Sequence, residues 1–122
     1  MRAALALLAD VFLVLVFVVI GRASHHAGDG AAGVAGTAWP FLAGLAIGEV
    51  ATRAWRRPAA LWPTGVGVWL ATVGAGQLLR VISGPGTDVA FVIVSAAFLG
   101  LFLLGWRLAA GLVPASRPRI PG

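Results

Sequence analysis

The sequence predicts an all-α integral membrane protein, a four-helix bundle with both termini on the cytoplasmic side. Hydrophobic residues make up 60% of its 122 positions and charged residues 11%, a balance that excludes an ordinary soluble domain and a disordered chain. The apolar residues fall into segments of about 20 residues, the length that crosses ~30 Å of hydrocarbon. Seven of the nine arginines lie at segment ends that share one side if the chain crosses the membrane four times.

The four apolar segments define one transmembrane domain, residues 1–107, and a tail, residues 108–122. We expect the spans at residues 3–21, 35–52, 63–82 and 88–106. The first is long enough to span and contains Asp10, so we interpret it as a retained helix rather than a cleaved signal peptide. The segment from Arg22 to Gly36 is rich in glycine and polar residues, which predicts a flexible outer loop. The tail is rich in proline and arginine, and we predict that it is disordered.

The arginines orient the chain. The seven on the shared side are Arg2, Arg53, Arg56, Arg57, Arg107, Arg117 and Arg119. Only Arg22 and Arg80 lie opposite, so the positive-inside rule makes the first group cytoplasmic in a prokaryotic inner membrane. The net charge of +5 does not indicate nucleic-acid binding, because the arginines flank apolar spans instead of forming a polar basic surface. The chain has no cysteine, which excludes disulfides, thiolate metal sites and thiol nucleophiles.

Two acids and two arginines are predicted to form an inner polar layer. Asp10 lies about 10 Å into the first span from its cytoplasmic end. Glu49 lies about 6 Å along the second span from Arg53, which is at the cytoplasmic end of that span. Glu49 and Arg53 are four residues apart in the acid-first order, so an ion pair along one helix is the favoured interpretation. Asp10 has no partner on its own helix, and Arg107 ends the fourth span on the same side. An interhelical ion pair and a transport or proton-relay role both remain open for Asp10.

A second polar cluster is predicted at the outer rim, where the ends of all four helices meet. Its members are Arg22, His25, Gln77, Arg80 and Asp88. Such a set suits an anion or proton site, but an acid at a helix start also complements the helix dipole, and arginines also extend to lipid headgroups. His25 and His26 lack further metal ligands nearby. We therefore predict no catalytic residue, no metal site and no cofactor.

Small residues at four-residue spacing predict where helices approach closely. They are Gly44, Gly48, Gly67, Gly74 and Gly100. Glycine removes the side chain that keeps helices apart, so these faces pack either within the bundle or between protomers.

Several short motifs, in order along nearly the whole chain, resemble one known family. They are Gly21-Arg22-x-Ser24-His25, Trp39-Pro40-Phe41, Gly65 with Trp69, Gly76-x-x-x-Arg80 and Gly105-Trp106-Arg107. The chain resembles the prokaryotic membrane family catalogued as domain of unknown function 3054. The resemblance implies a four-helix inner-membrane protein and no particular activity.

Three functional classes follow. A non-catalytic subunit that forms a homo-oligomer or joins a partner membrane protein needs only packing faces and fixed topology, and we place it first. A small-solute, ion or proton-coupled transporter or channel comes next, because Asp10 and Gln77 are polar groups that suit a pathway. An outer-face enzyme built on His25 is a distant third. In each of these classes we expect the helices to contact the lipid bilayer as well.

Overall fold

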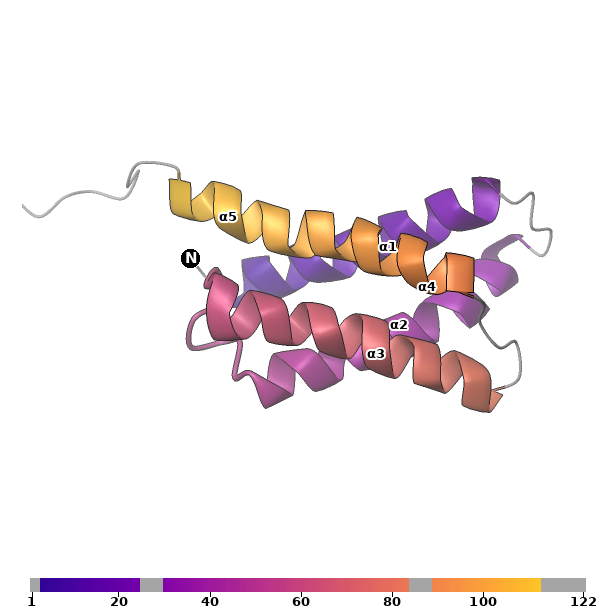
Figure 1. Ribbon diagram of the computed structural model, residues 1–122, viewed down its shortest axis with the longest axis horizontal. Coiled ribbons are helices and arrows are strands. Elements are labelled where there is room, and N and C mark those ends of the chain that lie inside the picture. The colour runs from indigo at the N-terminus through magenta and orange to yellow at the C-terminus, as the bar shows by residue number, and fades with distance from the viewer. Residues whose placement is uncertain (1–2, 25–29, 84–88, 113–122) are drawn as a thin grey trace, which may run out of the picture.

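The computed structural model describes residues 3–24, 30–83 and 89–112, and these form an antiparallel bundle of four spans (Figure 1). The first two are α1 (Ala3–Ser24) and α2 (Gly30–Ala51). The third consists of the short π-helical segment η1 (Leu61–Gly65) and α3 (Val66–Ser83). The fourth consists of α4 (Val89–Leu99), the π-helical η2 (Gly100–Leu104) and α5 (Gly105–Leu112). The described helices include four that are long and apolar enough to cross a membrane, which confirms the predicted all-α class.

The element boundaries differ from the predicted ones in the outer loop and in the tail. α1 runs on to Ser24 and α2 begins at Gly30, so residues 22–24 and 30–36, which we expected in a flexible loop, are helical. The fourth span runs on to Leu112, so residues 108–112, expected in the disordered tail, are helical as well. Hydropathy marks where a helix leaves the hydrocarbon, whereas backbone hydrogen bonding continues into the interface. The rest of the predicted loop and tail, residues 25–29 and 113–122, lies outside the described residues.

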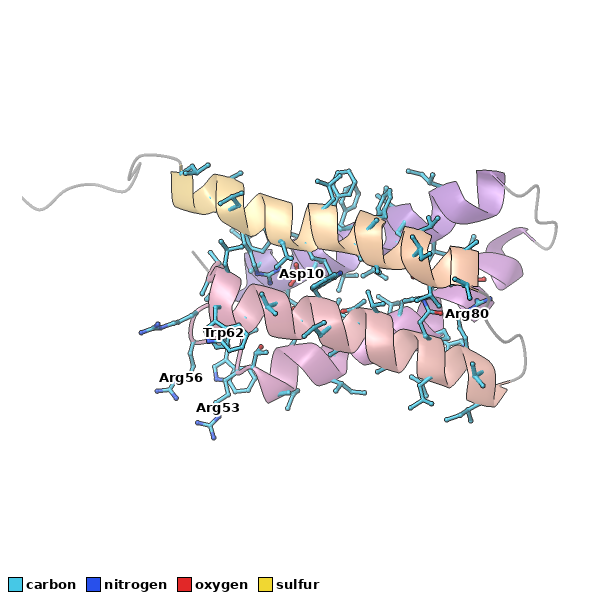
Figure 2. All side chains as sticks on the ribbon, in the orientation of Figure 1. Asp10, Arg53, Arg56, Trp62 and Arg80 are labelled. Carbon is cyan, nitrogen blue, oxygen red and sulfur yellow. The ribbon has the colours of Figure 1, made fainter. Side chains whose placement is uncertain are left out.

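The start of α1, the end of α5 and the connection between α2 and η1 lie at one end of the bundle (Figure 1). Arg53 and Arg56 project outward from this end, and Arg80 lies at the opposite end (Figure 2). We call the first the arginine-rich end. Trp55 and Trp62 are exposed there, the latter at 73%, as suits tryptophans at headgroup level.

Close contact between α2 and α3 depends on glycine. A Cβ atom on Gly44 would lie 2.8 Å from the carbonyl oxygen of Ala71, and one on Gly48 would lie 2.8 Å from the Cα of Val68. Any side chain at these positions would therefore force the helices apart. The Gly44/Gly48 face packs within the bundle, which decides between the two alternatives that the sequence left open.

The other three predicted packing glycines behave differently from one another. Gly67 faces the side chain of Thr52, and a Cβ on Gly100 would lie 2.9 Å from the indole Nε1 of Trp69. That indole also donates a 3.0 Å hydrogen bond to the carbonyl of Ala96, which joins α3 to α4. Gly74 has open space where a Cβ would be placed, so it is not a close-packing position within this chain, and packing between protomers stays a prediction for it. Small-residue spacing identifies a face but does not say which neighbour covers it.

Phenyl rings fill the middle of the bundle. Phe17 on α1 lies 5.5 Å from Phe41 on α2, 6.1 Å from Phe91 and 5.3 Å from Phe98, both on α4, measured between ring centroids. Phe41 and Phe91 are 5.9 Å apart in an edge-on arrangement, a geometry that aromatic pairs favour. The cluster joins three helices about 10 Å along α1 from Asp10.

Candidate functional site: a buried ion pair and a second carboxyl

The site begins with Asp10, which lies on the inward stripe of α1. Ala6, Val14 and Phe17 share this stripe and are buried, as residues three or four positions apart share a helix face. Asp10 is 0% exposed and lies between the helices (Figure 2). A carboxylate placed so deeply is retained only with a partner.

Arg107 on α5 is that partner. Its Nη2 lies 2.6 Å from Asp10 Oδ2, and its Nη1 donates a 2.9 Å hydrogen bond to Oδ1. This two-point contact is the strong form of an arginine–carboxylate pair. Both side chains are fully buried. The structure therefore confirms the interhelical alternative for Asp10 as a contact, between the first and the last helix of the described chain.

The remaining donors of the guanidinium are also used. Arg107 Nη1 donates to the carbonyl of Leu103 at 3.0 Å, and Nε donates to the carbonyl of Pro58 at 2.8 Å. Pro58 belongs to the connection between α2 and η1. Arg107 thus links α1, α5 and that connection at the arginine-rich end.

Trp106 completes the surroundings of the pair. Its indole Nε1 donates a 2.9 Å hydrogen bond to Asp10 Oδ1, and the guanidinium carbon of Arg107 lies 4.5 Å from its ring centroid. Room for the arginine comes from Gly65, where a Cβ would lie 3.0 Å from Arg107 Cδ. The π-helical η2 comes directly before Trp106 and Arg107, and such wide turns change the direction of the side chains that follow.

Glu49 does not pair with Arg53, so that prediction was wrong. α2 ends at Ala51, and Arg53 has a left-handed backbone with φ 52°. The amide of Arg53 donates to the carbonyl of Val50, and the amide of Ala54 donates to that of Glu49, which is the Schellman pattern of helix termination. Arg53 therefore leaves the helical face before the four-residue spacing can act, and its side chain points away from the bundle (Figure 2).

Glu49 lies beside Asp10 instead. The two carboxyl groups are within hydrogen-bonding reach of each other, and the charge of Arg107 also acts on Glu49. Among the described residues Arg107 forms its salt bridge with Asp10, and Glu49 forms none. Glu49 Oε2 is buried and has no hydrogen-bond partner, and the same is true of the hydroxyl oxygen of Thr64. The predicted inner polar layer thus contains Asp10, Glu49 and Arg107, without Arg53.

Only part of the predicted outer rim can be placed. His25 and Asp88 lie outside the described residues, and Arg22 belongs to the last turns of α1. Gln77 is buried and donates a 2.7 Å hydrogen bond to Ser95 on α4. The guanidinium of Arg80 lies 4.7 Å from the centroid of Phe91. Gln77 and Arg80 therefore both contact α4, and both have further interactions.

Within the described part of the chain, no group of three or more metal-ligating side chains comes together. An open hollow of about 580 Å³ lies between α1 and α2. It is lined by Leu15, Val34, Ala35, Ala38, Trp39 and Leu42. This lining is apolar and includes no member of the inner polar layer.

Sequence reasoning missed three contributors to the site. Trp106 had a signal, since Gly105-Trp106-Arg107 ends an apolar span and is one of the family motifs, but no contact with Asp10 was predicted for it. Gly65 was noted without a role. The carbonyl of Pro58 had no signal, because every residue carries a carbonyl and only the folded connection selects this one.

These features define a helical membrane protein whose one fully buried ion pair, within the described residues, joins its first and last helices. The comparisons with known proteins agree with that class. The profile of the family described as "Protein of unknown function (DUF3054)" matches residues 7–110, and the chain belongs to this family. No curated protein matches the chain. No solved structure matches it either.

Proposed function

We propose that this protein is a non-catalytic subunit of a membrane complex in a prokaryotic inner membrane, with both termini cytoplasmic. The observation that carries the proposal is that Asp10 is buried and that its carboxylate is held by donors of the protein itself. Its two oxygens accept hydrogen bonds from Arg107 and Trp106, and it is 0% exposed. A residue that binds a transported solute must exchange partners during the cycle, whereas Asp10 is held by three donors from one helix.

The outer surface supports the same proposal. Only 22–33% of each span is buried inside the monomer, so most of each helix faces lipid or another protein. Short four-helix bundles enclose little volume for a pathway of their own. A subunit needs a rigid shape and a fixed topology, and the ion pair and the arginine distribution supply these.

A proton-coupled transporter is the second candidate, and a specific observation favours it. Glu49 places a second carboxyl beside Asp10, and intramembrane carboxyl pairs are typical of proton relays. The two candidates differ in whether the purified protein alone moves protons.

Two measurements distinguish the candidates. The first introduces a photo-crosslinking amino acid at one exposed position on each span and illuminates native membranes. The positions are Phe12, Ile47, Leu70 and Ile93. A subunit should give protein adducts from one or two of these helices, with the buried Leu45 as the control that gives none. The second measures proton flux in liposomes that contain only the purified protein. Lipid adducts alone at all four positions, together with flux that Asp10→Asn abolishes, would replace the subunit by the transporter.

A further inference from the structure

The inner polar layer has an imbalance of charge. Asp10 and Glu49 are two acids, and Arg107 is one base. Among the described residues, the other elements that pack around them bring no compensating cation, since η1, α4 and η2 contain no charged residue and the one charged residue of α3, Arg80, lies at the other end. The arginines of the nearby connection, Arg53, Arg56 and Arg57, are exposed. With both acids ionised, the layer would hold one uncompensated negative charge at membrane depth, which is strongly disfavoured.

The contact between the two carboxyl groups has the same requirement. An ionised carboxylate accepts hydrogen bonds but has no donor. Two carboxyl groups can therefore share a hydrogen bond only when one of them carries a proton. Both oxygens of Asp10 accept hydrogen bonds from the Arg107 guanidinium, which leaves Glu49 as the donor between the two carboxyl groups. The buried, unpartnered Oε2 of Glu49 fits this assignment, because a neutral carboxyl tolerates an unsatisfied oxygen better than a carboxylate does.

We propose that Asp10, Glu49 and Arg107 form a proton-binding site, in which one proton held on the Glu49 carboxyl is donated to ionised Asp10. The proposal does not depend on whether the protein is a subunit or a transporter. Its ligand is the proton itself, and its chemistry is a neutral acid, a carboxylate and a guanidinium that together carry no net charge.

Infrared spectroscopy of the purified protein in lipid tests the site directly. A neutral carboxylic acid gives a carbonyl stretching band that is separate from the amide bands and shifts in D₂O. The background is small, since the chain has only four acidic side chains. We expect one such band at neutral pH. It should disappear in Glu49→Gln, where Asp10 stays ionised against Arg107, and also in Asp10→Asn, where Glu49 becomes the ionised partner of Arg107.

The remaining two acids provide the matched control. Asp29→Asn combined with Asp88→Asn should leave the band unchanged. Glu49→Gln keeps the size and hydrogen-bonding capacity of the neutral acid, so we expect it to retain the parent's circular dichroism even if Asp10→Asn does not fold. Absence of the band in the parent at neutral pH would overturn the proposal. A band that survives Glu49→Gln, or one that is lost in the Asp29/Asp88 control, would do the same.

Discussion

Removing the charge of Asp10 should destabilise the bundle by an amount that the structure allows us to estimate. Asp10 accepts three hydrogen bonds of 2.6–2.9 Å, two of them from the guanidinium of Arg107, whose side chain is 0% exposed. Hydrogen bonds to charged groups contribute about 1.5–3 kcal/mol each, net of those made to water. Breaking a buried ion pair from one side costs about 3–5 kcal/mol, because the remaining charge stays buried.

Because Glu49 lies beside Asp10, we expect a smaller loss of stability from the single substitution at Asp10 than from the double substitution at both acids. In Asp10→Asn the neighbouring Glu49 carboxyl is close enough to replace the lost counter-ion in part, so we expect the free energy of unfolding to fall by about 3 kcal/mol. In Asp10→Asn combined with Glu49→Gln no carboxylate remains near Arg107, and the loss should approach about 5 kcal/mol. The assay is unfolding by sodium dodecyl sulfate in mixed micelles, followed by circular dichroism.

Two controls separate the ion pair from general effects of charge. Arg56→Gln also removes one charge, but from an exposed side chain, and should change the free energy of unfolding by no more than about 0.5 kcal/mol. Asp10→Leu combined with Arg107→Met removes both charges and should restore most of the lost stability, since apolar pairs often replace buried ion pairs without loss. The reasoning is refuted if Asp10→Asn with Glu49→Gln costs less than about 1 kcal/mol, or if the apolar pair is as unstable as Asp10→Asn alone.

Three further predictions concern packing, helix termination and topology. Gly48→Ala should lower the free energy of unfolding by about 1–3 kcal/mol through overpacking, whereas Gly74→Ala, which has open space, should not lower it in the same assay; equal losses would contradict the packing. Arg53→Gly should raise the free energy of unfolding by roughly 1 kcal/mol, because glycine adopts the left-handed φ without strain, and a decrease would argue against the Schellman ending. In intact cells an impermeant thiol reagent should label Asp29→Cys and leave Ser116→Cys unlabelled if both termini are cytoplasmic, and the reverse pattern would invert the topology.

The sequence was sufficient for the fold because span length, hydropathy and arginine placement are local properties of a chain in a membrane. It also placed Asp10 and Arg107 in one layer, since Asp10 lies near the start of the first span and Arg107 at the end of the fourth, and these two ends share one side of the predicted bundle. It failed for Glu49 because the four-residue rule assumes that the helix continues, and α2 ends at Ala51. A left-handed arginine at the helix end carries no sequence signal, since glycine is the residue expected there.

The sequence also did not show which neighbouring helix each glycine face contacts. From the sequence, Gly44, Gly48 and Gly74 had equal standing as packing positions, yet two of them contact α3 and the third has open space. Which helix neighbours which depends on the rotation of each helix about its axis. In a span that is apolar on all sides, hydropathy does not determine that rotation, and the buried polar contacts of Asp10 and Gln77 do.

The phenyl cluster separates the charged groups at the two ends of the bundle interior. Phe17, Phe41 and Phe91 lie between the acids at the arginine-rich end and Arg80 at the other end, and Arg80 itself rests on the ring of Phe91. A hydrated ion that moved along the axis of one monomer would have to pass these rings, beside which lies the buried hydrogen bond from Gln77 to Ser95. The rings therefore separate the acid pair from Arg80, and we expect protons to reach the acid pair from the arginine-rich end, which lies nearer to it.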